Sequence, residues 1–426
     1  MGDWRTKTTT FYGWWIVGVL FILLFNTGGM GFYVFPVFIE SFQQEFGWTL
    51  TQISVSAGIW AIVFGFSGPV IGFMIARFGA RKIIVTAAII AGLTNFLFAS
   101  LTALWMLYLG TMISGFVVAG TTLIPAQTLI TNWFNRYRGR AMGLAMAGIG
   151  FGGFCLPSFN EYFIRTFGWR EAWLFASLVL FVLLIPLILF FIRSSPEELG
   201  LLPDGDSAAG STGPGKSRPK TGMTPKRALK TKEFWLLAFI FLLILTGSSA
   251  LSFHFVPFVT LEVGFTNQQG AFFLGLTIGF SIVGRLVYGW LADHYNLVLL
   301  MVSILLLMAC GPAVLWIFFL SSGFSEVNYL WLFAVPYGIA IGSNAILFPV
   351  LIGRCFGELH FSKILGLLMS GFAIGIIVGI PVSGKIFDAT GSYELVLKMS
   401  FLVFVLAIIL MLFVRPNRYH GEFRSF

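Results

Sequence analysis

Charged residues are scarce in this sequence. They make up only 10% of its 426 residues, whereas a soluble protein keeps about 25% to cover its surface. Apolar residues account for 58%, and the mean hydropathy is +0.91. This balance excludes a soluble globular protein and indicates a chain that crosses a membrane many times.

Residues that build disulfides, metal sites and catalytic centres are also few. Cys155, Cys310 and Cys355 stand in or beside apolar segments at unrelated spacings, which predicts neither a disulfide framework nor a metal site. The four histidines are scattered, and no Ser/His/Asp set, metal-ligand cluster or phosphate-cradling loop is present. We therefore expect no cofactor, no metal and no enzymatic activity. Membrane topology explains the net charge of +9 more simply than nucleic acid does.

Apolar runs of about 18 or more residues give twelve candidate spans, which predicts an all-α membrane protein. In the first half of the chain they cover 13–38, 49–75, 82–100, 104–130, 140–163 and 171–192. In the second half they cover 234–258, 269–291, 297–320, 328–352, 364–387 and 393–414. The stretch 193–232 is rich in Gly, Ser, Pro and Lys, which predicts a flexible linker between two six-helix halves, 1–192 and 233–426.

Lysine and arginine are unequally distributed between the two sides of this topology. The even number of spans places both termini on one side. If that side is the cytoplasm, the basic residues outside are Arg165, Arg170, Lys385 and Lys398, Arg285 is within a span, and the other 21 of the 26 face inside. The positive-inside rule therefore predicts cytoplasmic termini, and we expect the first apolar run to be retained as a span.

The two halves echo each other in sequence. Gly143 and Gly148 in the fifth span recur as Gly366 and Gly371 in the eleventh, each 223 residues later. Repeats of half the chain fit a duplicated six-span unit, and such units form transporters whose substrate site lies between the halves near the midplane. A channel and a polytopic membrane enzyme are the other classes, but a two-fold repeat fits rocking of two halves better than a pore.

Arg285 is the only charge in the eighth span, Gly270 to Ala292. It lies roughly 12 Å inward of Asp293, at about 1.5 Å per residue, which is too deep for easy snorkelling. A charge at this depth costs about 2.5–3.5 kcal/mol on insertion scales, and no acid stands mid-span elsewhere. We interpret Arg285 as an anion-binding residue in a central aqueous cavity. The alternative is an arginine that bonds backbone carbonyls and ties two helices together.

A basic loop follows the second span. Its sequence, Gly72-Phe-Met-Ile-Ala76-Arg77-Phe-Gly79-Ala-Arg81-Lys82, resembles the G-x-x-x-D-R-x-G-R-R/K loop of the major facilitator superfamily. Ala76 replaces the acid of that pattern, whereas Asp293 keeps it at the equivalent place in the second half. The resemblance implies a contact that stabilises an outward-open state. A plain positive-inside tether is the alternative for Arg81.

A second motif opens the fifth span. The stretch 133–153, WFNRYRGRAMGLAMAGIGFGG, carries Arg138 and Arg140 and then small residues at helical spacing. It resembles the signature of the monocarboxylate transporter family. The opening FYGWWIV and the linker's PEELGLLPDG are similar to bacterial members of that family and to oxalate:formate antiporters. The resemblance covers nearly the whole chain.

This resemblance implies a major facilitator fold and proton-coupled symport of a small monocarboxylate, such as lactate or pyruvate, across a bacterial inner membrane. It matches Arg285 to the carboxylate-binding residue, with Ser281 where animal members carry an acid. The oxalate carriers use a second cation in span eleven, where this chain has none at mid-span. A dianion would then leave a charge unpaired, which argues for a monocarboxylate. An organic-anion exchanger of the oxalate/formate type is the alternative.

Further polar candidates for the site lie near mid-membrane depth, except His254, which lies toward the outer end of its span. Tyr337 resembles a pocket tyrosine of bacterial members, and His254 matches a histidine of their seventh span. His254 is one option for the proton carrier; the other is a proton shared at the arginine–carboxylate site. The remaining polar candidates, Asn26, Thr121, Thr122 and Asn344, have a hydrogen bond to a neighbouring helix as their alternative. Tyr33 and Phe372 are candidates for the pocket wall, with a lipid-facing or core role as their alternative. We expect a monomer whose partners are the anion, protons and the lipid bilayer.

Overall fold

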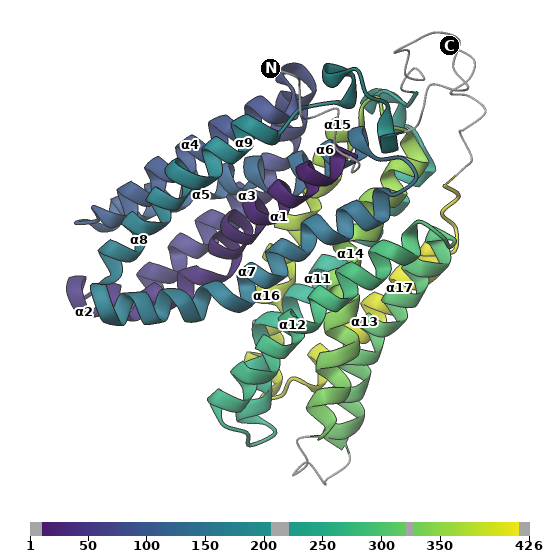
Figure 1. Cartoon of the computed structure of the whole chain (residues 1–426). Helices are drawn as coiled ribbons and strands as arrows, with labels where there is room; N and C mark the ends of the chain where they lie inside the picture. Colours follow the sequence, from purple (N-terminus) through teal and green to yellow (C-terminus); the bar gives the residue numbers. More distant parts are fainter. Residues whose placement is uncertain (1–10, 206–220, 321–327, 417–426) are drawn as a thin grey trace.

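The computed structural model describes residues 11–205, 221–320 and 328–416. These residues contain no β-strand, and they form twelve helical segments that are long and apolar enough to cross a membrane. The predicted all-α membrane architecture is therefore confirmed. Figure 1 shows the helices in two groups, which lie close together where the linker runs and diverge toward the other side. We call these the linker side and the opposite side.

The first group of helices runs from Gly13 to Phe191. Its helices are α1 (Gly13–Gly29), η2 (Met30–Val34), η3 (Phe35–Phe38), α2 (Ile39–Phe46), α3 (Leu50–Phe78), α4 (Ala80–Ala99), α5 (Leu104–Thr121), α6 (Leu123–Trp133), α7 (Arg138–Phe167), α8 (Trp169–Leu178), η4 (Val179–Leu184) and α9 (Ile185–Phe191). The label η marks short π- or 3₁₀-helical pieces, several of which continue a neighbouring α-helix.

The second group runs from Lys232 to Met411. Its helices are α11 (Lys232–Leu261), α12 (Asn267–Ala292), α13 (Leu297–Leu320), α14 (Asn328–Phe356), α15 (Phe361–Met369), α16 (Gly371–Thr390) and α17 (Glu394–Met411). The linker itself carries η5 (Pro196–Leu199), η6 (Pro203–Gly205) and α10 (Pro225–Ala228). Its composition did not predict these short helices.

The first span is longer than predicted. Its helix was expected to end at residue 38, but it continues through α2 to Phe46, and Gly47 ends it in the left-handed region with a φ of 66°. The prediction failed here because Glu40 and its polar neighbours interrupt the apolar run, although they do not interrupt the helix. The polar side chains are exposed, while Phe42 on the other face is fully buried.

Matching capping boxes open spans two and eight. Thr49 caps α3 by accepting the Gln52 N–H, and the Gln52 side chain accepts the Thr49 N–H. Thr266 and Gln269 make the same exchange at α12, 217 residues later. These pairs satisfy N–H groups that the first helical turn leaves without a partner. They extend the internal repeat beyond the positions that the sequence analysis used.

The fourth span is broken at Thr122. This residue has φ −109° and ψ −110°, so it separates α5 from α6. Pro125 lies three residues further on and contributes to the break, because proline lacks an N–H and its ring crowds the carbonyl four residues earlier. As a result α5 ends at Thr121 and α6 begins at Leu123.

Glycines bring the two groups of helices into backbone contact on the linker side. A Cβ atom added to Gly289 of α12 would lie 2.7 Å from the Gly139 carbonyl oxygen and 2.9 Å from the Gly143 Cα atom, both of α7. On the other seam, a Cβ on Gly68 of α3 would lie 2.8 Å from the Gly366 carbonyl oxygen of α15. Because only glycine fits at such distances, the sequence permits a tight closure here.

Candidate functional site

Arg285 lies on α12 where this helix packs against α7 of the first group. Its side chain is buried, with 5% exposed. Gly150 of α7 leaves the space that the guanidinium occupies, since a Cβ there would overlap its Nη1 atom. The cation of the second group thus contacts the backbone of the first group directly.

The partners of Arg285 are neutral. Its Nη1 atom donates to the Ser281 hydroxyl, one turn earlier on α12, at 3.0 Å. Tyr33 of η2 faces the guanidinium from the first group of helices. Arg285 forms no ion pair with an acid in the part of the chain that the structure describes. A guanidinium has five N–H donors, and Nε has no acceptor among the described residues, so donors remain for an anion.

A buried amide, that of Gln127, joins the groups of helices between α6 and α14. Gln127 of α6 has 1% of its surface exposed and donates through Nε2 to the Ala345 carbonyl of α14 at 3.3 Å. Its Oε1 atom, like Oδ1 of the neighbouring Asn344, has no partner among the described residues. Buried acceptors without a donor are costly, so they are available to a water molecule or a ligand. Asn344 was predicted from the sequence, whereas Gln127 was missed.

Asn26 and Thr121 line a different space. Together with Thr94, Asn95 and Trp173 of α8 they border a cavity of about 40 Å³, and all of its lining residues belong to the first group of helices. The Thr121 hydroxyl donates to the Val117 carbonyl of its own helix. The structure therefore does not bring these two candidates together with Arg285.

Thr122 and Phe372 lie at the seam between α3 and α16. They border a cavity of about 10 Å³ that also includes Phe64, whose ring meets that of Phe372 edge-on at 5.0 Å. The Thr122 hydroxyl donates to the Val118 carbonyl at 2.6 Å. In this arrangement Phe372 packs between the two groups of helices. The Thr122 hydroxyl hydrogen is already donated and is not available to a ligand.

Tyr337 and His254 lie inside the second group of helices. Tyr337 is buried between Phe333 and Phe404, with its hydroxyl beside Ser248 and Ser252 of α11. The His254 Nδ1 atom is 3.2 Å from the Tyr393 hydroxyl, and its Nε2 is 3.0 Å from the Ile380 carbonyl oxygen. Both ring nitrogens therefore have partners within the second group.

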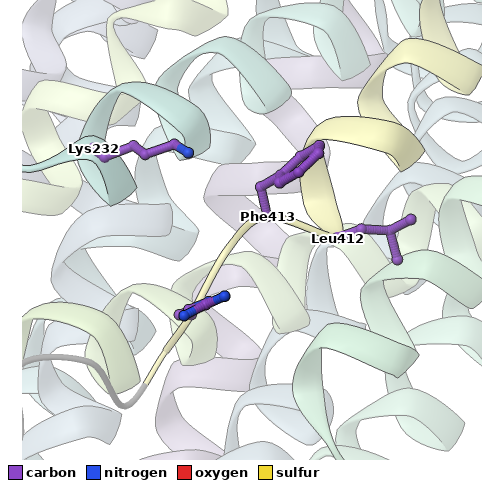
Figure 2. Close-up of a pocket in the computed structure, with 4 residues that line it drawn as sticks. Lys232, Leu412 and Phe413 are labelled. Atoms are coloured by element: carbon purple, nitrogen blue, oxygen red, sulfur yellow. The ribbon is translucent and has the colours of Figure 1, made fainter.

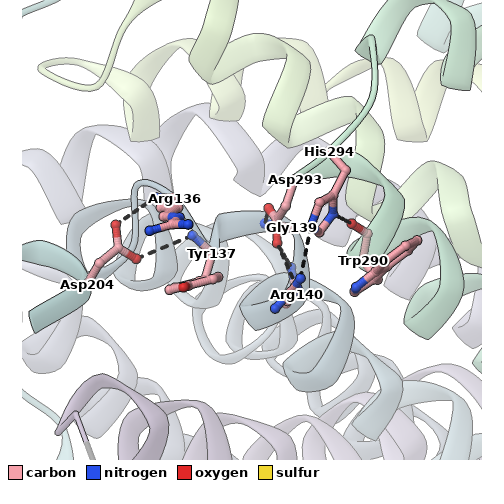
Figure 3. A network of polar contacts seen from close by, with 8 residues as sticks. All are labelled: Arg136, Tyr137, Gly139, Arg140, Asp204, Trp290, Asp293 and His294. Atoms are coloured by element: carbon pink, nitrogen blue, oxygen red, sulfur yellow. Dashed lines mark hydrogen bonds and ion pairs between the residues drawn. The ribbon is translucent and has the colours of Figure 1, made fainter.

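Asp293 joins the groups on the linker side (Figure 3). Its carboxylate accepts the Gly139 N–H at 2.6 Å and the Arg140 N–H at 3.0 Å. These amides belong to the first turn of α7, where a negative charge is favoured by the helix dipole. The Arg140 side chain adds an Nε–Oδ2 distance of 3.7 Å and a contact to the His294 ring. Burial raises the pKa of Asp293, and the Arg140 and Gly139 amides and the Arg140 charge oppose that rise.

A second charged contact and the linker complete this closure. Arg138 of α7 forms an ion pair with Glu358, which precedes α15. The Glu358 N–H donates to the Thr221 carbonyl at 2.9 Å, so the end of the linker holds this loop. At the other end of the linker, Asp204 accepts the N–H groups of Asn135 and Arg136 just before α7, and Figure 3 shows the contact with Arg136. Glu358 was not predicted from the sequence.

The family model described as Major Facilitator Superfamily matches residues 19–335, which is well over half of the chain. The chain belongs to this superfamily. Its fold agrees: the proton:xylose symporter XylE bound to 6-bromo-6-deoxy-D-glucose superposes with a TM-score of 0.74 at 14% identity, covering 97% of this chain and 98% of the symporter.

Relatives within the superfamily carry the names that the sequence resemblance implied. The chain is 27% identical to monocarboxylate transporter 2 of Homo sapiens over 425 residues, covering 90% of this chain and 81% of the relative. It is 26% identical to monocarboxylate transporter 12-B of Danio rerio over 435 residues, covering 96% and 88%. The predicted resemblance to the monocarboxylate transporters is confirmed, whereas the resemblance to bacterial members and to oxalate:formate antiporters stays a prediction.

The superfamily loop after span two makes its contacts differently from Asp293. Ala76 is exposed, and the Arg77 guanidinium lies over the Phe78 ring at 5.2 Å. Arg81 donates to the Leu189 carbonyl of α9, and Gly79 forms the turn with a φ of 86°. Gly72 packs against the Ser362 carbonyl oxygen at the start of α15. This seam therefore rests on glycine packing, whereas the α7–α12 seam also has a buried carboxylate.

Proposed function

We propose that this protein is a secondary transporter of small monocarboxylates, of the lactate or pyruvate type, that works by alternating access. The observation that carries the proposal is Arg285, a buried cation at the contact between the two groups of helices that has no acid partner among the described residues. The names of the two relatives support the substrate class.

In this proposal the carboxylate binds to the free donors of Arg285, and Tyr33 borders the site from the first half. Asn344 and the newly found Gln127 supply amides for other polar groups of the substrate or for water. Because Ser281 is neutral, the loaded site carries no net charge when the substrate has one carboxylate. A second carboxylate would be unpaired in a medium of low dielectric constant.

We further propose that the linker side faces the cytoplasm of a cell with an inner membrane, as the distribution of lysine and arginine predicts. The contacts of Asp293 and Arg138 then close the cytoplasmic side, and the described arrangement corresponds to an outward-facing state. Opening toward the cytoplasm requires these contacts to break, while the halves part along α7–α12 and α3–α15. Net uptake is coupled to a proton that travels with the substrate.

The test is uptake by purified protein in proteoliposomes. Labelled lactate and pyruvate should enter, and an inward proton gradient should accelerate net uptake. Unlabelled lactate or pyruvate should compete at least about tenfold better than oxalate, a gap of about 1.4 kcal/mol. Equal competition by oxalate would contradict the single-cation site. Uptake that ignores the proton gradient would favour an organic-anion exchanger instead.

A further inference from the structure

A basic pocket lies on the linker side between the start of α11 and the end of α17, two neighbouring helices of the second half (Figure 2). It is lined by Lys232, Leu412, Phe413 and Arg415 and has a volume of about 310 Å³. The Lys232 ammonium points toward Phe413, with Nζ 5.5 Å from the centroid of the ring. None of these residues belongs to the site around Arg285.

The two cations of the pocket form no ion pair with an acid that the structure describes. Lys232 and Arg415 are both exposed. Glu233 is the only acid between residues 221 and 261, and its side chain is buried. The exposed Lys226 and Lys230 precede Lys232 and add to the positive charge of this surface. The pocket therefore has the charge to hold an anionic group.

The other side chains around the pocket are apolar and exposed. Leu412 is 62% exposed and Phe413 is 56% exposed, and both stand beside the cations rather than in the core. Trp235 lies one turn into α11, outside the pocket lining; it is 62% exposed and donates its indole N–H to the Leu229 carbonyl at 2.9 Å. Tryptophan with one polar tip and one apolar face is typical of the level where lipid headgroups meet the acyl chains.

We propose that this pocket binds the headgroup phosphate of an anionic phospholipid. The phosphate lies between the Lys232 ammonium and the Arg415 guanidinium, and the acyl chains cover Leu412, Phe413 and Trp235. A lipid accounts for both the charged and the apolar part of this surface, because a free phosphate ion would pair with the cations only and would not contact the exposed apolar side chains. Basic pockets between membrane helices on the cytoplasmic side bind anionic headgroups for this reason. The proposal is independent of the transported substrate.

The experiment is native mass spectrometry of the purified protein with equal amounts of dioleoyl-phosphatidylglycerol and dioleoyl-phosphatidylcholine, which differ in headgroup charge. Attraction by a surface cation is worth about fivefold in affinity, so two cations predict a preference of about twenty-five-fold for the anionic lipid. The double variant Lys232→Gln/Arg415→Gln should bind the two lipids equally. Lys232→Arg/Arg415→Lys should keep the preference.

The matched control is Lys82→Gln/Lys385→Gln. It removes the same net charge from two exposed lysines that lie outside the pocket, and it should bind phosphatidylglycerol as the wild type does. The proposal is overturned if the preference survives in the pocket variant or is lost equally in the control. Binding of glycerophosphate as tight as that of the whole lipid would also overturn it, since the ligand would then be a soluble anion.

Discussion

Arg285 shows how a single residue sets the charge of the site. Its nearest polar partners, the Ser281 and Tyr33 side chains, are not acids, so no partner that the structure describes neutralises the guanidinium. Only the space beside Gly150 lets this side chain reach the first half. Charge, depth and contact with both halves therefore meet at one residue. These are the properties that a carboxylate site between two moving halves requires.

We expect Arg285→Lys to reduce uptake by at least about tenfold while the protein stays folded in the membrane. Lysine keeps the charge but loses the planar pair of donors that grips a carboxylate. The matched control is Arg354→Lys, the same change at an exposed position on α14, which should transport normally. Uptake is measured in proteoliposomes with equal protein content. A wild-type rate for Arg285→Lys would show that the residue only ties helices together.

At the scale of elements, the α7–α12 pair is the seam on which closure depends most directly. Gly289 allows the two backbones to touch, and Asp293 then reaches the first turn of α7 one helical turn later. Packing and charge thus act at neighbouring points of the same contact. The two contributions are separable by substitution, because one needs a missing Cβ and the other needs a carboxylate.

Gly289→Ala should shift the protein away from the closed linker side. The added methyl group would overlap the α7 backbone, and overpacking of this kind costs about 1–3 kcal/mol. Gly275→Ala is the matched control on the same helix, since a Cβ there meets nothing within 4 Å. The measurement is the distance between spin labels attached to cysteines introduced at positions 82 and 295, in a variant without the native cysteines. It is made by double electron–electron resonance spectroscopy. An unchanged distance distribution for Gly289→Ala would contradict the proposed seam.

The same label pair tests Asp293. Because burial raises its pKa, the carboxyl binds a proton more tightly in the closed state than in an open state where water surrounds it. Falling pH, through the range above the ordinary value of about 3.9, should therefore stabilise the closed linker side. Asp293→Ala should remove this pH dependence and, by leaving two amides of α7 unpaired, populate the open state at neutral pH. His294 is unchanged in the variant, so a pH dependence that persists there would be assigned to the histidine.

The lone arginine and the acid after span eight were visible in the sequence because each breaks a local pattern. The pairings Gln127–Ala345 and Arg138–Glu358 were not, since their partners lie about 220 residues apart and share no local signal. Tyr337 shows a different limit. Its depth in the membrane was predicted, but a helix that is apolar all round does not reveal which face meets the other half. The structure places it inside the second half instead.

For the whole molecule, the charge of the empty carrier decides how the cycle runs. With substrate bound the site is near neutral, but without it Arg285 is a bare cation that must reorient through a dry barrier. Asp293 and Glu358, the described acids that close the linker side, already have partners and do not compensate the charge of Arg285. The return of the empty carrier is then the slow step in the proposed cycle.

Exchange of substrate for substrate should therefore be faster than net uptake. An inward proton gradient should stimulate net uptake and have little effect on exchange. We expect the stimulation to survive in His254→Gln, because both nitrogens of that ring are engaged within the second half. The rates of exchange, of net uptake and of net uptake under a proton gradient are measured in proteoliposomes with and without internal substrate. Loss of the stimulation in His254→Gln, with exchange preserved, would assign the proton to the histidine.

The break at Thr122 divides the fourth span into two helices, α5 and α6. Helix α6, on the linker side of the break, carries Gln127, whose side chain donates a hydrogen bond to the Ala345 carbonyl of the other half. The backbone of Thr122 lies outside the helical region, so α5 and α6 are separate helices. In the other half, Pro349 lies 224 residues after Pro125, but α14 continues without a break from Asn328 to Phe356. The two halves therefore differ at the Gln127–Ala345 contact: one side comes from a broken span and the other from a continuous helix.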